Sequence, residues 1–164
     1  MEIIKYNKKY LEEAMCIWNN IIEDGIYFPQ IYVLKDLEEA DKYFSSQDYT
    51  GLAIEEEKVY GVYILHPNNM GRCGHICNAS YAVDKNIRGK GVGEALVRDC
   101  IKQGAKLGYK ILQFNAVVLS NEAAHRLYKK IGFNEIGIVK KGYLNKNNEY
   151  EDIVLYYIDL WLIK

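Results

Sequence analysis

The sequence lacks the features that mark membrane, secreted and nucleic-acid-binding proteins. No apolar run in its 164 residues approaches the roughly 20 residues that a membrane-spanning helix needs. Positive and negative side chains nearly balance, and a formal net charge of -1 gives no attraction for nucleic acid or an anionic membrane surface. The first residues, Met1 to Lys5, do not have the layout of a signal peptide. We therefore expect a cytoplasmic protein with neither a nucleic-acid nor a membrane partner.

Cysteine is too sparse to build a disulfide framework in a chain of this size. We expect free thiols at all four positions: Cys16, Cys73, Cys77 and Cys100. Cys73, His75 and Cys77 alternate and would share one face of a strand, which raises a zinc site as an alternative. No second pair of ligands follows at zinc-finger spacing, and cysteines in strands commonly act as small buried hydrophobes. We therefore expect no metal.

Long linkers, low-complexity tracts and repeats are also missing, so we expect a single domain over residues 1–164. Apolar residues at helical spacing predict helices over residues 11–22, 35–44, 95–107 and 121–131. Apolar runs predict strands near residues 3–4 and over residues 50–55, 59–66, 75–83, 111–119, 133–139 and 153–160. The charged stretch from Lys140 to Glu149 is expected to be the turn between the last two strands.

The order of these elements predicts an α/β fold. The strands between residues 50 and 83 follow one another with short turns, which is typical of an antiparallel meander. A strand, a helix and a strand then follow over residues 75–119, which implies a parallel pair joined by a crossover. We expect a mixed, mostly antiparallel sheet of about seven strands, with a central parallel pair and about four helices.

A glycine-rich loop within residues 86–96 (NIRGKGVGEAL) gives the strongest indication of function. Three glycines let its backbone turn tightly and expose N–H groups: Gly89, Gly91 and Gly93. The helix that follows offers unpaired N–H donors and the positive end of its dipole, and Arg88 and Lys90 add positive charge. The segment predicts a pyrophosphate-binding loop, with a glycine-rich turn that binds no ligand as the alternative.

The spacing of the glycines separates this loop from two common nucleotide-binding motifs. A dinucleotide fingerprint starting at Gly89 needs a glycine where the chain has Glu94, and a P-loop needs a hydroxyl residue where Lys90 is followed by Gly91. The remaining pattern, R-x-x-G-x-G from Arg88 to Gly93, resembles the acyl-coenzyme A loop of the GNAT family of N-acetyltransferases.

A second motif strengthens this resemblance. The segment from Asn121 to Phe133 is similar to the family signature N-x-x-A-x-x-L-Y-x-x-x-G-F, at the expected distance after the loop. Two motifs in the right order are far more specific than either alone. The resemblance covers most of the chain and implies the order of strands and helices given above.

The resemblance also implies which residues bind acetyl-coenzyme A. The pyrophosphate would lie on the loop formed by Arg88, Gly89, Lys90, Gly91, Val92 and Gly93. Backbone amides of Tyr81, Ala82 and Val83 would bind the pantetheine arm, at the end of a splayed strand. Asn121 would hydrogen-bond to the pantetheine, although a helix N-cap alone also explains an asparagine there.

Tyr128 is the predicted general acid. In the resemblance this tyrosine lies beside the coenzyme sulfur, and a phenol with a pKa of about 10 can protonate a leaving thiolate. The chain has 15 tyrosines, so a packing role is the alternative. The general base stays open, because the strand over residues 75–83 has no carboxylate where many relatives carry a glutamate. An ordered water, His75, Glu55, Tyr81 or an already neutral substrate amine are the alternatives.

Asn78 and Asn115 interrupt strands that are otherwise apolar, and buried amides need hydrogen-bond partners. Across the split between the central strands they could hold a substrate carboxylate or carbonyl. This pairing resembles the family branch that acts on amino acids and proline-like analogues; satisfaction by neighbouring backbone at a bulge is the alternative. Tyr27 and Phe28 would wall the acceptor site, or serve as core residues instead.

The sequence thus predicts an acetyl-coenzyme A dependent N-acetyltransferase that acts on a small-molecule amine, with an amino-acid-like acceptor favoured. The amine would attack directly in a ternary complex, because no cysteine shows the setting of a nucleophilic thiolate. Acetylation of a protein N-terminus or lysine is one alternative, and a non-catalytic acyl-coenzyme A sensor is another. The sequence leaves a homodimer open.

Overall fold

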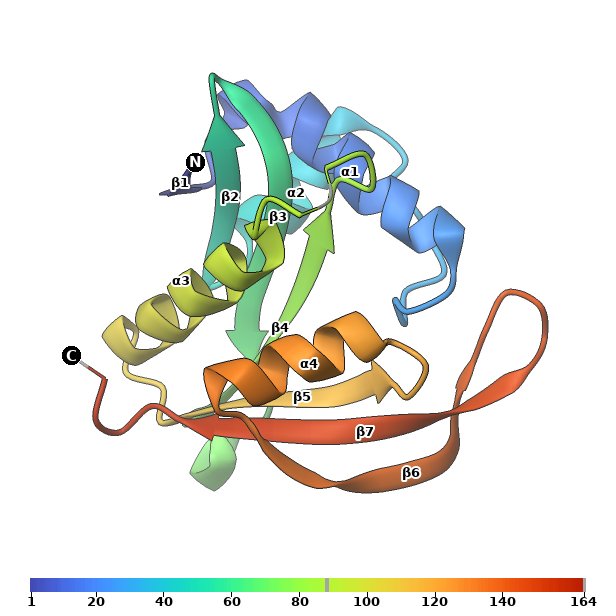
Figure 1. Ribbon diagram of the computed structural model, residues 1–164. Coiled ribbons are helices and arrows are strands. Elements are labelled where there is room, and N and C mark those ends of the chain that lie inside the picture. The colour runs from blue at the N-terminus through green and yellow to red at the C-terminus, as the bar shows by residue number, and fades with distance from the viewer. Residues whose placement is uncertain (88, 164) are drawn as a thin grey trace.

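The computed structural model describes residues 1–87 and 89–163. Within these residues the chain forms one seven-stranded sheet in the order β1-β2-β3-β4-β5-β7-β6 (Figure 1). Its strands are β1 (Glu2–Lys5), β2 (Tyr49–Glu55), β3 (Lys58–Pro67), β4 (Ile76–Val83), β5 (Ile111–Val118), β6 (Asn134–Leu144) and β7 (Tyr150–Asp159). Its α-helices are α1 (Leu11–Asp24), α2 (Leu37–Ser45), α3 (Val92–Lys106) and α4 (Glu122–Ile131). The mixed α/β fold predicted from the sequence is confirmed.

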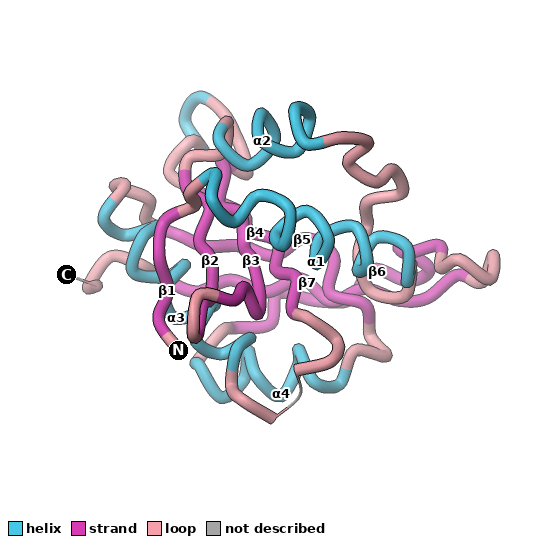
Figure 2. The backbone as a smooth tube through the Cα atoms, turned by 90° about the horizontal axis from the view of Figure 1, so that it is seen from above, coloured by secondary structure: helices cyan, strands magenta, loops and turns pink. Residues whose placement is uncertain are grey.

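The helices cover both faces of the sheet. Figure 2 shows α1 and α2 on one face and α3 and α4 on the other. The apolar stripe of α1 explains its side of this arrangement, because Ala14 and Trp18 are fully buried and Trp18 packs edge-on against Phe28 and Phe44. On the opposite face, Leu96 and Cys100 of α3 are fully buried against the sheet. A hydrophobic core therefore packs against each face of the sheet.

Helix ends follow the predicted signals. Gly25 ends α1 in a left-handed conformation with φ +59°, and Gly132 ends α4 with φ +104°. The Asn121 side chain caps α4 by accepting a hydrogen bond from the Ala124 N–H at 3.2 Å. The Asn121 cap fixes the start of α4, which contributes to the site described below.

The sheet splits between its two central strands. β4 and β5 are parallel and pair only at Ile76 with Ile111 and at Cys77 with Leu112. Beyond these pairs the strands diverge (Figure 1), while β5 stays paired with β7 through an irregularity between Phe114 and Val117. The outer part of β4 therefore faces β5 across a gap that backbone hydrogen bonds do not close.

The last hairpin is longer than predicted. The turn between β6 and β7 occupies only residues 145–149, and the two lysines expected within it belong to β6. Lys141 adopts φ +55° at an irregularity in the pairing, and its N–H and the Lys140 ammonium both contact the Asp152 carboxylate. This local bend lets the strand continue past its charged residues.

No helix in the described part of the chain combines the length and apolar character needed to cross a membrane.

Candidate active site

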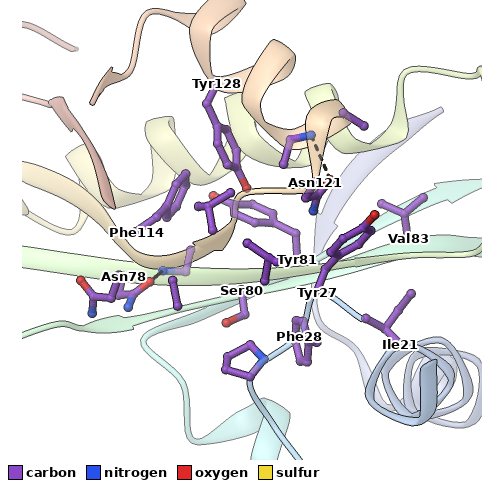
Figure 3. A pocket seen from close by; sticks show the side chains of 18 residues that line it. Ile21, Tyr27, Phe28, Asn78, Ser80, Tyr81, Val83, Phe114, Asn121 and Tyr128 are labelled. Atoms are coloured by element: carbon purple, nitrogen blue, oxygen red, sulfur yellow. Dashed lines mark hydrogen bonds between the residues drawn. The ribbon is translucent and has the colours of Figure 1, made fainter. Parts of the chain in front are cut away.

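A cavity of about 660 Å³ lies where β4 and β5 separate. Its walls come from β4, β5, the start of α4 and the loop after α1 (Figure 3). These walls include most of the residues that the sequence predicted: Tyr27, Phe28, Asn78, Tyr81, Val83, Asn115, Asn121 and Tyr128. The structure therefore brings together predicted residues that are up to 101 positions apart.

The cavity reaches both faces of the sheet through the split. Tyr81 of β4 packs into the core below α3, while Phe28 belongs to the core below α1 and α2. Asn78 and Ser80 alternate with Tyr81 along β4 and so point to the opposite face. Figure 3 shows Tyr128 and Asn121 on one side of β4, and Ser80 and Phe28 on the other. A ligand on either face can therefore reach the same central space.

Tyr128 is held by aromatic contacts and directs its hydroxyl into the cavity (Figure 3). The residue is only 9% exposed, and its ring lies 4.7 Å from Phe114, 5.3 Å from Phe133 and 5.7 Å from Tyr156, between centroids. Burial raises the pKa of Tyr128 well above its ordinary value. The hydroxyl therefore carries its proton at neutral pH.

A hydrogen-bonded histidine lies one helical turn before Tyr128 and was missed in the sequence analysis. His125 Nε2 lies 3.0 Å from the Val118 carbonyl oxygen, and Nδ1 lies 2.8 Å from the Tyr156 hydroxyl. Because a carbonyl only accepts, Nε2 carries a proton, and in that tautomer Nδ1 accepts from the Tyr156 hydroxyl. These bonds tie α4 to the end of β5 and to β7. The sequence offered one indication of a role for His125, namely its position inside the second motif.

An amide cluster occupies the inner end of the cavity, where β4 and β5 part. The side-chain nitrogens of Asn115 and Asn78 both donate to Asn68 Oδ1, at 2.6 and 3.4 Å. The Asn78 oxygen accepts from the Ala79 N–H at 2.6 Å, so the expected alternative of satisfaction by neighbouring backbone holds in part. Gln113 Nε2 donates to Asn115 Oδ1 at 2.9 Å. Asn68, in the turn after β3, is the partner that the sequence did not indicate.

The glycine loop has the backbone expected of an anion cradle. Gly89 and Gly91 adopt φ +78° and +71°, and a Cβ at either would meet no atom within 4 Å, so glycine is needed for conformation and the space above stays open. Gly91 is the N-cap of α3, where N–H groups remain unpaired. Val92 is buried, and a Cβ at Gly93 would lie 3.8 Å from Leu127, in ordinary van der Waals contact.

Of the two cations predicted beside this loop, the structure describes only Lys90. Arg88 lies outside the described residues. Lys90 contacts the Glu55 carboxylate at 3.1 Å and lies 4.8 Å from the centre of the Tyr60 ring. Its half-exposed ammonium would have to leave or share these partners to contact a phosphate.

The end of β4 leads from the cavity toward the loop. Tyr81 and Val83 line the cavity, whereas the Ala82 side chain is buried in the core below α1 and α2, so only its backbone could serve a ligand. The Tyr81 hydroxyl is buried and has no hydrogen-bond partner among the described residues. Burial raises the pKa of Tyr81 well above its ordinary value, so it is a donor and not a base.

The candidate bases lie elsewhere. Glu55 pairs with Lys90 and with the terminal amine at 3.2 Å, and this pairing lowers the pKa of its carboxyl. His75 is exposed just before β4. Neither residue lines the cavity, and the described residues that do line it include no aspartate, glutamate or histidine. Of the alternatives for proton removal, an ordered water or a neutral amine fits this neutral wall.

The cysteines are not arranged for nucleophilic or metal chemistry. Cys77 and Cys100 are buried, and burial raises the pKa of the Cys77 thiol to about 12. Cys16 and Cys73 are exposed and do not line the cavity. Among the described residues, no three side chains of histidine, cysteine, aspartate or glutamate gather where they could hold a metal ion.

Two curated relatives resemble part of the chain. N-acetyltransferase aca1 of Schizosaccharomyces pombe is 34% identical over 97 residues, which cover 58% of this chain and 46% of that protein. N-acetylaspartate synthetase of Xenopus tropicalis is 30% identical over 111 residues, covering 64% of this chain and 38% of that protein. The chain thus spans less than half the length of these relatives.

Structural similarity extends over nearly the whole chain. The Salmonella typhimurium protein yncA, solved with its cofactor acetyl-CoA, superposes with a TM-score of 0.88 over 96% of this chain and 92% of its own, at 15% identity. This likeness shows a shared fold. The model of the acetyltransferase (GNAT) family matches residues 14–133, which include both sequence motifs. The chain therefore belongs to the acetyltransferase (GNAT) family.

Proposed function

We propose that this chain transfers the acetyl group of acetyl-CoA to the amine of a small, amino-acid-like molecule. The observation that carries the proposal is the single cavity that reaches both faces of the sheet beside the protonated hydroxyl of Tyr128. Two reactants can enter such a cavity from opposite faces and meet without a covalent enzyme intermediate. The membership of the family and the acetyl-CoA bound by yncA support the identity of the donor.

The donor would extend from the glycine loop to the cavity. Its pyrophosphate would lie on the backbone of Gly89, Lys90, Gly91, Val92 and Gly93, with Arg88 adding charge. Beyond Cys77, β4 has no backbone pairing with β5, which leaves peptide groups of Tyr81–Val83 for the pantetheine arm. Asn121 would contact the same arm while it caps α4.

The reaction needs one proton donor and one proton acceptor. The neutral amine attacks the thioester carbonyl carbon, and the carbon–sulfur bond of the resulting tetrahedral intermediate breaks. Tyr128 would give its proton to the departing thiolate, as the direction of its hydroxyl into the cavity supports. The amine proton would leave through water, since the described cavity wall offers no carboxylate or histidine.

The acceptor would bind on the face of α1 and α2. Asn78 and Asn115 offer N–H donors without net charge, which suits a carboxylate or carbonyl beside the amine. Tyr27 and Phe28 close this side of the cavity and favour a small molecule over a polypeptide. The relative named N-acetylaspartate synthetase supports an amino acid as acceptor.

Calorimetric titration with acetyl-CoA, followed by an acetylation assay on a panel of amino acids, tests the proposal. We expect micromolar binding that weakens at least about tenfold when Arg88 and Lys90 are both changed to alanine. We also expect coenzyme A release with at least one amino acid. Binding without turnover on any amine or peptide would favour the acyl-CoA sensor, turnover on peptides alone would favour the protein acetyltransferase, and absence of binding would refute all three.

A further inference from the structure

The β6–β7 hairpin contacts the loop that carries the acceptor wall, although 118 residues separate the two points of contact. Tyr143 of β6 is 8% exposed, and its hydroxyl lies 3.0 Å from the Phe28 carbonyl oxygen and 3.2 Å from that of Gly25. Both oxygens only accept, so the tyrosine donates its proton toward them. A single side chain thus ties down the two carbonyls that flank Tyr27.

The hairpin turn adds a second contact at Gly25. The Lys146 N–H donates to the Gly25 carbonyl at 3.2 Å, and a Cβ at Gly25 would lie 3.0 Å from the Lys146 Cβ. Gly25 also needs its φ of +59° to end α1. The first residue after α1 therefore contacts the hairpin turn, and this contact fixes the direction in which the loop leaves the helix.

The remainder of the loop is held by α1 itself. Trp18 Nε1 donates to Gln30 Oε1 at 3.1 Å, and the Asn19 side chain bonds to both the N–H and the carbonyl of Leu34 at 2.9 Å. The segment up to Phe28 that lines the cavity has backbone carbonyls hydrogen-bonded to the hairpin instead, while the Phe28 ring also packs edge-on against Trp18 of α1. Loss of the Tyr143 contact should therefore loosen the cavity wall and leave the loop beyond Gln30 in place.

We propose that Tyr143 is a positioning residue for acceptor binding, and that the β6–β7 hairpin sets the affinity for the acceptor by fixing Tyr27 and Phe28. The proposal rests on the proposed function for the identity of the site. It assigns a role to a segment that lies outside both sequence motifs and does not line the cavity. The donor side, formed by α3, α4 and the glycine loop, makes no use of this contact.

Tyr143→Phe removes the hydroxyl and keeps the ring. Since a neutral hydrogen bond contributes about one power of ten or less, we expect the KM for the amino-acid acceptor to rise about tenfold, with kcat within about twofold. Hydrogen–deuterium exchange of residues 25–29 should quicken by a similar factor, and the Kd for acetyl-CoA should not change. Tyr150→Phe is the matched control, because this tyrosine of the same hairpin is 65% exposed.

An unchanged acceptor KM or unchanged exchange at residues 25–29 would overturn the proposal. It would also be overturned if exchange quickened throughout the sheet, since Tyr143 would then support the whole fold. The exchange measurement needs no substrate, so it tests the contact even if the wild-type chain acetylates no amine. In that case the proposed function fails, while the exchange data still show whether Tyr143 holds residues 25–29.

Discussion

The two sides of the cavity are built in different ways. The side proposed to bind the donor uses three short segments, namely the end of β4, the glycine loop with the start of α3, and the start of α4, and its ligand groups would be mainly backbone N–H groups and helix ends. The side proposed to bind the acceptor uses side-chain amides and aromatics from the loop after α1, β4 and β5, which contact Asn68 and Tyr143 in turn. In this proposal donor recognition depends mostly on local segments of the chain, whereas acceptor recognition depends on contacts between distant segments.

Tyr128 lies between the two sides and should show the largest effect. Tyr128→Phe removes the proton for the leaving thiolate, and we expect kcat to fall about 100-fold or more, because general acid catalysis commonly contributes that much. The affinities for acetyl-CoA and for the acceptor should stay within about twofold. Steady-state kinetics with calorimetry checks this, and Tyr32→Phe, at a residue 86% exposed, is the control. Wild-type turnover in Tyr128→Phe would remove this residue from the mechanism.

Gly91→Ala should damage the donor side alone. A left-handed φ of +71° disfavours alanine by about 1–2 kcal/mol, so we expect acetyl-CoA to bind about tenfold more weakly while the acceptor KM changes little. Gly137→Ala is a matched control, since a Cβ there also meets no atom within 4 Å and its φ is not positive. Equal losses of affinity for both substrates would show that the two sides are not independent.

Asn68→Ala should act on the acceptor side alone, with a smaller effect. It removes the shared acceptor of Asn78 and Asn115, and we expect the acceptor KM to rise about fivefold, because two neutral hydrogen bonds are lost and the freed amides can turn to water. Binding of acetyl-CoA should be unaffected. The control is Asn134→Ala, at an exposed asparagine of β6. Weaker binding of acetyl-CoA to Asn68→Ala but not to Asn134→Ala, measured by calorimetry, would contradict the independence of the two sides.

The last prediction concerns the pH dependence of stability. Burial raises the pKa of Tyr128 and of Tyr81 on the donor side, while the acceptor amides do not titrate. In the unfolded chain these tyrosines ionise near a pKa of about 10, so the unfolded state loses protons first. These tyrosines should thus lower the free energy of unfolding above about pH 10, by up to about 1.4 kcal/mol per pH unit per buried tyrosine. The buried thiols of Cys77 and Cys100, whose pKa values are also raised, should begin a separate fall near about pH 8.5 in both proteins compared. Denaturant titrations over pH, on wild type and Tyr128→Phe, should show a shallower fall in the variant; identical curves would contradict the account.

The same contrast explains what could be predicted from the sequence. Asn121 and Gly132 give the ends of α4 because caps are local signals, and the glycine loop is recognisable because Gly89 and Gly91 need positive φ in any context. Alternating apolar residues likewise predict the strands on both sides of the split. Each of these signals depends on residues that are close together in the sequence.

Other parts of the site depend on register between distant segments. Asn78 and Asn115 stand out as polar residues in apolar strands, yet their shared partner Asn68 lies in a turn with no distinguishing pattern. Tyr143 reaches the loop after α1 only because β6 continues past its lysines through an irregularity, which charge alone did not predict. Such contacts become visible only when the sheet is assembled.

Hydrogen–deuterium exchange with each substrate in turn tests the two-sided cavity most directly. Acetyl-CoA alone should protect residues 81–83 and 89–93 and leave residues 25–29 unchanged, because donor and acceptor are expected to occupy opposite faces of the sheet. Addition of an amino-acid acceptor in the presence of coenzyme A should then protect residues 25–29. Protection of residues 25–29 by acetyl-CoA alone, or no protection of the glycine loop, would contradict the account.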